Sequence, residues 1–179
     1  APFGVRSMSR SPLLLDPRFW PSWLLVALTW LLARPSLRTQ DRIARWLAQR
    51  LAGSGNGRIA VIRRNLELCF PELSAEQRRQ LCRDQLHSVL LLAFELLNLI
   101  WSPRDKLLCK VEIHGREDLE RALALGEPLL LVTGHFTTFI TSLAALSAIV
   151  PLQAVYRRMD NPVLEEQLYQ RGARKYPIT

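Results

Sequence analysis

A histidine follows an apolar run of strand length in the second half of the chain. Residues 128–133 read Pro-Leu-Leu-Leu-Val-Thr and lead into Gly134 and His135, after which a new apolar helical pattern begins. Near-continuous apolar runs of this length are typical of parallel strands buried on both faces. Ligands of open α/β sheets bind just beyond the carboxyl ends of such strands. A histidine there titrates near neutral pH and can act as a general base, so His135 is our candidate catalytic residue.

Position 140 lacks the carboxylate that a catalytic histidine normally uses to hold its tautomer. It is Ile140, which cannot accept a hydrogen bond from an imidazole N–H. Loss of an orienting carboxylate costs about 10⁴ in kcat in a well-studied catalytic triad. Glu95 or Asp160 could replace it only if the fold brings one of them near His135. The segment offers no Ser or Cys nucleophile, so His135 would activate a substrate hydroxyl directly, and the alternative is a purely structural histidine.

A second polar group follows the short apolar segment 152–156, which we also expect to be a strand. It contains Arg157 and Asp160, followed by Asn161 and Pro162. The planar guanidinium fork binds phosphate or an oxyanion through two parallel hydrogen bonds. Arg157 is therefore a candidate for binding an anionic substrate, with a solvated loop as the alternative. Asp160 either joins Arg157 in substrate binding or, with Asn161, caps the next helix, in which Pro162 suits the first position.

Helical patterns fill the preceding part of the chain. Residues 38–52 and 58–69 predict amphipathic helices, separated by the glycine-rich breaker 53–57. Ser74 and Gln77 have the spacing of a capping box, which predicts the start of a long helix that runs to about residue 101.

From residue 110 onward, short strand patterns alternate with helical ones. Strands are expected at 110–114, 128–133 and 152–156, and helices at 116–125, 137–149 and 162–175. This alternation predicts an α/β fold of βαβ units with right-handed crossovers and a parallel-rich sheet. We expect an N-terminal segment at 1–37, a helical region at 38–103 and an α/β core at 104–179. Since the first residue is Ala and no evident ending follows Tyr176, we also expect a truncated chain without its C-terminal part.

Residues 19–33 carry no charge and include Trp20, Trp23 and Trp30. The run is shorter than the roughly 20 residues that span a bilayer comfortably. Tryptophan suits the membrane interface, and the arginines that follow favour a cytoplasmic C-terminal side. We expect a short or tilted transmembrane anchor helix, with a buried core helix as the alternative.

The charge balance narrows the class of partner. The 179 residues have a formal net charge of +8, and 49% of them are hydrophobic. The arginines stand between apolar residues at helical spacing, which favours an anionic membrane surface or a phosphorylated ligand over nucleic acid. Cys69, Cys82 and Cys109 have no metal-binding spacing, so we expect no metal site and reduced, buried thiols.

Five stretches in order resemble the late acyltransferases of lipid A biosynthesis, the lauroyl/myristoyl acyltransferase family within the glycerolipid-type membrane acyltransferases. They resemble the family's Arg-Asn-Leu…Cys-Phe-Pro-Glu segment, a helix end, a Val-Glu-Ile-His-Gly stretch, the start of a His-x4-Asp/Glu signature and a Tyr-Arg…Asp-Asn-Pro block. In this chain they are residues 63–72, 95–101, 111–115, 134–138 and 156–162.

The resemblance implies transfer of a fatty acyl group from acyl carrier protein to a hydroxyl of a lipid A precursor, without a cofactor. It implies an active site on the cytoplasmic face of the cell inner membrane, with His135 as general base and Arg157 stabilising negative charge. Ile140 stands where the family has Asp or Glu. A second hypothesis is therefore a degenerate, weak or inactive member that binds lipid or acyl carrier protein. A third, resting only on charge, is an unrelated membrane or nucleic-acid binder.

Overall fold

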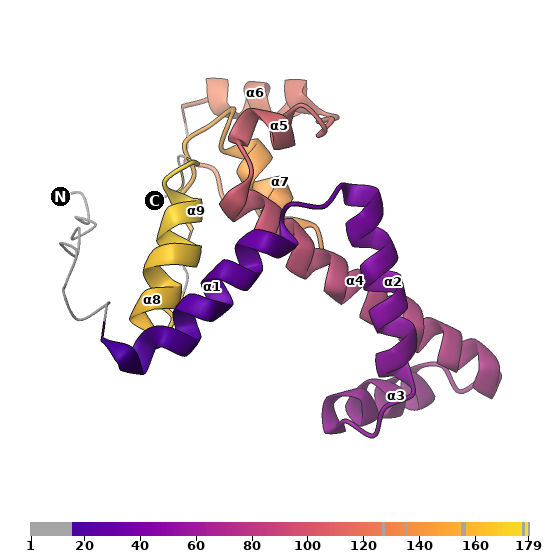
Figure 1. Ribbon diagram of the computed structural model, residues 1–179. Helices are drawn as coiled ribbons and strands as arrows, with labels where there is room; N and C mark the ends of the chain where they lie inside the picture. Colours follow the sequence, from indigo (N-terminus) through magenta and orange to yellow (C-terminus); the bar gives the residue numbers. More distant parts are fainter. Residues whose placement is uncertain (1–15, 127, 135, 155–156, 177, 179) are drawn as a thin grey trace.

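The computed structural model describes residues 16–126, 128–134, 136–154, 157–176 and 178. Within them the chain is a series of helices joined by turns and loops (Figure 1). After a 3₁₀ turn come α1 (Trp20–Leu32), α2 (Leu37–Ala52), α3 (Gly57–Cys69), α4 (Ala75–Trp101), α5 (Arg104–Leu108), α6 (Arg116–Ala124), α7 (Phe139–Leu146), α8 (Pro162–Leu164), a π-helical segment (Glu165–Gln170) and α9 (Arg171–Ala173).

Side-chain caps start the three helices that build the N-terminal half. Ser36 Oγ accepts from the Thr39 N–H at 3.2 Å at the start of α2, and Asn56 caps α3 in the same way. At the start of α4, Ser74 Oγ accepts from the Gln77 N–H at 3.2 Å, while Gln77 Oε1 accepts from the Ser74 N–H at 2.7 Å. Both bonds satisfy donors that helix ends leave free. The predicted capping box is therefore confirmed.

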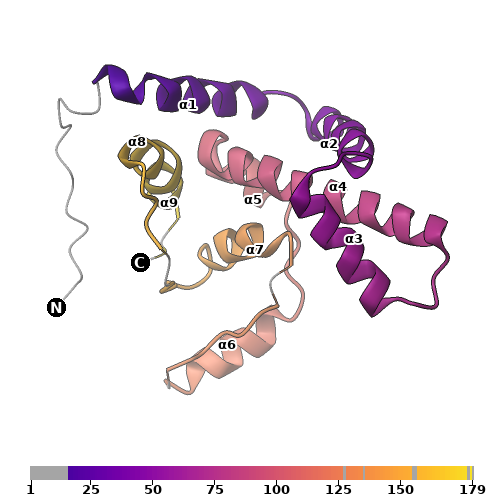
Figure 2. The same ribbon diagram turned by 90° about the horizontal axis from the view of Figure 1, so that it is seen from below.

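The long helix α4 is the element on which most of the others pack (Figures 1 and 2). Helices α2 and α3 lie against its N-terminal and middle parts, and α1, α7 and α9 lie against its C-terminal part. Its C-terminal end is capped by Lys175, which follows α9 and whose Nζ donates to the Ser102 carbonyl at 2.9 Å and to the last carbonyls of α4. Helix α6 projects away from this assembly in both views.

Two apolar clusters lie on opposite parts of α4. The first joins α2, α3 and α4 through buried side chains, and the second joins α4 to α7 and the C-terminal residues. Members of the first are Ala48, Ile59, Leu66, Cys82 and Leu86, and those of the second are Leu99, Ala144 and Tyr176. Apolar burial of this kind is the main favourable contribution to folding.

The expected α/β fold with a parallel-rich sheet is wrong for the described residues. They form no β-strand, and their strand-like pairing is limited to one isolated parallel bridge between Leu152 and Ile178. Residues 110–114 and 128–133 form no strand, and the side chains of Leu130 and Val132 are 85% and 86% exposed. A strand needs a second strand to pair with its backbone. The apolar pattern indicates a local preference for strand, but it does not show whether a second strand is present to pair with.

The expected helices were closer to the structure. The predicted ranges 38–52, 58–69 and 116–125 correspond to α2, α3 and α6, and Gly126 ends α6 with a φ of 73°. The predicted helix 137–149 is shorter, because α7 ends at Leu146. The predicted helix 162–175 begins at Pro162 as expected but contains the π-helical segment.

Helix α1 is neither a buried core helix nor a span. It has 13 residues, of which only Val26 and Thr29 are buried. In the described part of the chain, no helix is long and apolar enough to cross a membrane, so the expected transmembrane anchor is not found. The cysteines also differ from expectation: Cys82 is buried, whereas Cys69 and Cys109 are exposed.

Candidate functional site

The segment that leads to the predicted catalytic histidine forms neither a helix nor a strand. Residues 128–134 run without helix or strand toward His135, which itself lies outside the described residues. At the end of this segment, a Cβ added to Gly134 would come within 2.8 Å of the Phe136 ring. A contact that short does not occur between real side-chain atoms, so Gly134 allows the aromatic ring to fold back on the turn. A side chain at position 134 would therefore require the Phe136 ring to move.

Ile140 lies in the first turn of α7, which begins at Phe139. Its side chain packs against the cluster of Leu99, Ala144 and Tyr176 between α7 and α4. An isoleucine there adds apolar surface to the core, whereas a carboxylate at the same position would lose hydration on burial. The position that carries the motif acid in the resembling family therefore has a packing role in this chain.

A carboxylate does reach the start of α7 from another helix. The Thr141 hydroxyl donates to Glu95 Oε2 at 2.9 Å, which joins α7 to the C-terminal part of α4. Glu95 and Asn98 are the polar residues in the otherwise apolar stretch 89–100. Both polar side chains have hydrogen-bond partners: Glu95 accepts from Thr141, and Asn98 exchanges two hydrogen bonds with Gln40 of α2. The sequence signal was the presence of a carboxylate in an apolar helix, but only the fold shows that it lies beside position 140.

Arg157 and Asp160 are close to one another in a solvent-exposed loop. The Arg157 guanidinium lies 3.8 Å from the Asp160 carboxylate, and their side chains are 89% and 94% exposed. Such an exposed pair contributes little to stability. The cap of α8 is Asn161, whose Oδ1 accepts from the N–H groups of the next two helical residues, with Pro162 at the first position. The predicted cap is confirmed for Asn161 and Pro162, and Asp160 is left free of that role.

The same loop is tied to the N-terminal helix. Asn161 Nδ2 donates to the Ser22 hydroxyl at 2.8 Å, so α1 fixes the start of α8 immediately after Arg157 and Asp160. The described site residues therefore form two groups: Ile140, Thr141 and Glu95 at the α4–α7 contact, and the Arg157–Asp160 loop beside α1.

The model of one protein family matches almost the whole chain. Residues 7–175 match the bacterial lipid A biosynthesis acyltransferase model, a range that includes both groups of site residues. The chain belongs to this family. The resemblance in the order of the sequence motifs is thereby confirmed.

Individual relatives agree with the family assignment. The chain is 30% identical to the lipid A biosynthesis lauroyltransferase of Escherichia coli strain K12 over 156 residues. The match covers 87% of this chain and 51% of that protein. It is 34% identical over 161 residues to a lipid A biosynthesis acyltransferase of Haemophilus influenzae strain Rd, covering 86% of this chain and 50% of that protein.

A further relative is the lipid A biosynthesis palmitoleoyltransferase of Escherichia coli strain K12, at 24% identity over 169 residues, covering 84% of the chain and 49% of that protein. The chain spans about half the length of the curated relatives it matches. No solved structure gives a significant match.

Proposed function

We propose that this protein transfers a fatty acyl group from acyl carrier protein to a hydroxyl of a lipid A precursor on the cytoplasmic face of the inner membrane. The observation that carries the proposal is the family match over residues 7–175, which includes the Gly134-His135 motif and the Arg157 loop. The relatives are named for lipid A biosynthesis and for transfer of lauroyl or palmitoleoyl groups.

In the proposed mechanism, His135 accepts the proton of the acceptor hydroxyl as its oxygen attacks the acyl carbonyl. The carbonyl oxygen carries the negative charge of the intermediate, and the carrier leaves with a proton when the acyl bond to it breaks. General-base assistance of this kind contributes about 10²–10⁴-fold. Arg157 binds negative charge on the acceptor or the intermediate, which its exposed guanidinium is free to do because the contact with Asp160 is loose. Asp160, as the neighbouring carboxylate, is proposed as a second substrate-binding residue of this loop.

Glu95 is the carboxylate best placed to take over the task of the missing motif acid. It already accepts a hydrogen bond in the first turn of α7, from the residue next to Ile140. Because it comes from α4, it would act on the histidine only through the packing of α4 against α7.

The alternative is a family member that binds lipid or acyl carrier protein with little or no turnover. The packing of Ile140 into the α4–α7 core favours it, because the motif acid is replaced by a residue with a structural use. The two functions predict opposite results for the same variants.

The test measures acyl transfer to a lipid A precursor by the full protein and by variants at His135, Glu95 and Ile140. For the active enzyme, we expect His135→Ala to remove transfer almost completely and Glu95→Gln to lower it by at least about tenfold. Thr141→Val is the matched control for Glu95→Gln, because it removes the hydrogen bond between Thr141 and Glu95 but leaves the carboxylate, whereas Glu95→Gln removes the charge and keeps an acceptor oxygen.

Equal rates for the wild type and His135→Ala, both well above background, would exclude the catalytic role of His135. For the weak or inactive member, wild-type transfer is near background, and Ile140→Glu raises it only when His135 is present. That dependence marks residues that act as a unit. Thermal unfolding of each variant separates a lost fold from a lost reaction, which matters most for Ile140→Glu because it places a charge against an apolar cluster.

A further inference from the structure

The outer face of α2 carries three arginines around one tryptophan, a set that we call the arginine row. Its members are exposed and are spaced four residues apart, namely Arg38, Arg42, Trp46 and Arg50. The residues that α2 buries form a second row at the same spacing, namely Gln40, Ala44 and Ala48. The two rows are offset by two residues, which is about 200° around the helix axis. The arginine row therefore faces away from α4, against which α2 packs.

No acidic side chain neutralises the arginine row within the described part of the chain. None of its three arginines takes part in an ion pair there. The one acidic residue of α2 is Asp41, which instead accepts hydrogen bonds from Arg45 at 3.2 Å and from His87 of α4 at 2.8 Å. Solvated protein surfaces normally carry charges of both signs. A helix face with three positive charges and no negative one therefore indicates an anionic partner.

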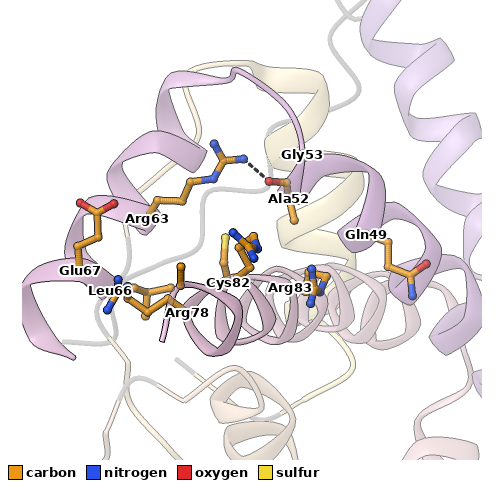
Figure 3. Close-up of a pocket in the computed structure, with 11 residues that line it drawn as sticks. Gln49, Ala52, Gly53, Arg63, Leu66, Glu67, Arg78, Cys82 and Arg83 are labelled. Carbon is orange, nitrogen blue, oxygen red and sulfur yellow. Dashed lines mark hydrogen bonds between the residues drawn. The ribbon is translucent and has the colours of Figure 1, made fainter. Parts of the chain in front are cut away.

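The arginines of the cavity between α2, α3 and α4 differ, because the fold uses them. Arg63 of α3 donates to the Ala52 carbonyl at the end of α2 (Figure 3). Arg78 donates to three backbone carbonyls between α3 and α4, and Arg83 pairs with Glu76 at 2.9 Å. In contrast, no hydrogen bond to another described residue occupies the guanidinium groups of the arginine row. Their donors are available to phosphate oxygens, whose geometry the guanidinium fork matches.

Trp46 gives the arginine row an amphipathic centre. Its side chain is 54% exposed, and the guanidinium carbon of Arg50 lies 5.2 Å from its ring centroid. An exposed indole leaves apolar surface in water, but the same ring suits the boundary between lipid headgroups and acyl chains, where tryptophan is enriched. Arginine and tryptophan together therefore favour a bilayer surface over a small soluble anion.

Helix α1 places an apolar face beside the arginine row. On its outer face, Leu24, Leu28 and Leu31 are 73%, 47% and 58% exposed. Figure 2 shows α1 and α2 on one side of α4, with α3 and α6 on the other. Gln40 holds the first two helices together, because its Nε2 donates to the Leu32 carbonyl at the end of α1 at 3.2 Å. Apolar and cationic faces side by side are typical of segments that lie in the interface of an anionic bilayer.

We propose that the arginine row of α2 binds the phosphate groups of anionic phospholipids at the surface of a bilayer, beside the apolar outer face of α1. The three arginines contact the headgroups, and the Trp46 ring lies at the boundary between headgroups and acyl chains. This contact goes beyond the proposed acyl transfer, because none of its residues takes part in that reaction.

Sedimentation of the full protein with vesicles tests the proposal. Vesicles of phosphatidylcholine are compared with vesicles that also contain phosphatidylglycerol, and the ratio of the two partition coefficients is the readout. We expect Arg38→Gln/Arg42→Gln to lower this ratio by roughly fivefold for each arginine removed. The matched control is Arg116→Gln/Arg121→Gln on α6, which removes the same charge from the other side of α4 and should leave the ratio nearly unchanged. An equal loss in both double variants would show general attraction to charge and overturn the proposal.

The fluorescence of Trp46 locates the contact. Phosphatidylglycerol that carries bromine near the glycerol end of its acyl chains quenches tryptophans at that depth, and the difference between the wild type and Trp46→Phe isolates the contribution of Trp46. We expect Trp46 to be quenched when the protein is bound, and Arg38→Gln/Arg42→Gln to reduce this quenching at equal amounts of bound protein. A quenched intensity that is the same in the wild type and in Trp46→Phe would show that the arginine row does not face the bilayer, and would overturn the proposal.

Soluble polyanions distinguish a bilayer from another acidic partner. Acyl carrier protein and a single-stranded nucleic acid are each added in place of vesicles, and the emission of Trp46 is again taken from the comparison with Trp46→Phe. We expect neither to shift this emission as phosphatidylglycerol vesicles do. An equal shift that Arg38→Gln/Arg42→Gln removes would assign the arginine row to a soluble partner and overturn the lipid assignment. The result is distinguishable from that for acyl transfer, because His135→Ala should keep the full vesicle ratio and the quenching of Trp46.

Discussion

At the scale of single residues, Arg157 combines a strong charge with almost no structural contact. Its side chain is 89% exposed, and its contact with Asp160 is 3.8 Å long. A surface pair of this kind contributes between zero and about 1 kcal/mol to stability. Because the Arg157 side chain contributes little to folding, a role in binding is the hypothesis to test.

We expect Arg157→Ala to leave the free energy of unfolding within about 0.5 kcal/mol of the wild type. Acyl transfer should fall by about tenfold or more, since a hydrogen bond to a charged group contributes about 1.5–3 kcal/mol. Steady-state transfer kinetics and thermal unfolding of the full protein measure the two effects. Arg158→Ala, at the neighbouring exposed position, is the control and should change neither. A large loss of stability with unchanged transfer would make Arg157 a structural residue.

At the scale of elements, one buried amide pair joins three helices. Gln40 of α2 and Asn98 of α4 exchange hydrogen bonds of 3.1 and 2.8 Å, and Gln40 Nε2 also donates to the Leu32 carbonyl at the end of α1. Both side chains are at most 5% exposed. Buried polar groups are costly when unpaired, so this pair fixes the lateral position of α2 on α4.

We expect Gln40→Leu to destabilise the protein by about 1–3 kcal/mol, because Asn98 is left buried without its partner. Gln40→Leu/Asn98→Leu should recover part of that loss, since neither amide then remains. Denaturant unfolding of the two single variants and the double variant gives the coupling energy. Additive losses would show that the two amides contribute independently.

The outer face of α1 is a second feature at this scale. Trp20, Leu24, Leu28 and Leu31 repeat at helical spacing and are between 47% and 73% exposed, while Val26 and Thr29 face inward. Thr29 Oγ1 accepts from the Trp101 indole N–H at 3.2 Å, which holds that inner face on α4. An apolar outer face on a helix too short to span a bilayer suits the membrane interface.

Changing only the outer face tests this interpretation without unfolding the helix. We expect Leu24→Gln/Leu28→Gln/Leu31→Gln to release the full protein from membranes, because each leucine loses roughly 1–2 kcal/mol of apolar burial. Fractionation of cells before and after a salt wash is the measurement. Leu123→Gln/Leu125→Gln, on the exposed side of α6 and just after it, is the control. Unchanged membrane retention would exclude α1 as the contact.

The sequence predicted the helices because their determinants are local. Ser74 and Gln77 cap α4 through residues three apart, and Gly126 ends α6 through its own φ. The strands at 110–114 and 128–133 were wrong because strand formation depends on a distant partner. An apolar run cannot show whether such a partner strand is present. The exposure of Val132 shows that no partner strand covers this segment among the described residues.

The same distinction holds for the site. Asn161 and Pro162 were recognised as a cap because the signal lies within three residues. The contact between Thr141 and Glu95 joins residues 46 positions apart, so no spacing rule could reveal it. The role of Ile140 in the α4–α7 core was likewise visible only from its neighbours. The prediction for His135 stands untested, because that residue lies outside the described part of the chain.

At the scale of the whole molecule, stability at low pH should depend on the contact between α2 and α4. Asp41 of α2 accepts hydrogen bonds from Arg45 at 3.2 Å and from His87 of α4 at 2.8 Å. The Arg45 guanidinium, and to a smaller extent His87, lowers the pKa of the Asp41 carboxyl. A lowered folded-state pKa stabilises the protein above the unfolded-state pKa, and the contribution is lost as pH falls through the folded-state value.

We therefore expect the wild type to lose stability below about pH 4, where unfolded aspartates take up protons. Asp41→Asn should lower the melting temperature at pH 7 and flatten the change between pH 5 and pH 3, because its side chain does not titrate. Thermal unfolding across this range is the measurement. Asp105→Asn is the control, since Asp105 lies in the first turn of α5 and away from this contact. Parallel pH profiles for the wild type and Asp41→Asn would contradict the assignment.

The unpaired segment before Gly134 also bears on the solubility of the chain. Leu129, Leu130, Leu131 and Val132 follow one another without a charge, and all four are at least 44% exposed. Uncharged apolar runs exposed to solvent are the segments through which chains stack into aggregates. In a crowded solution of this polypeptide, we therefore expect the residues before the predicted catalytic histidine to be a point at which one molecule joins the next. Self-association would begin where chemistry is expected.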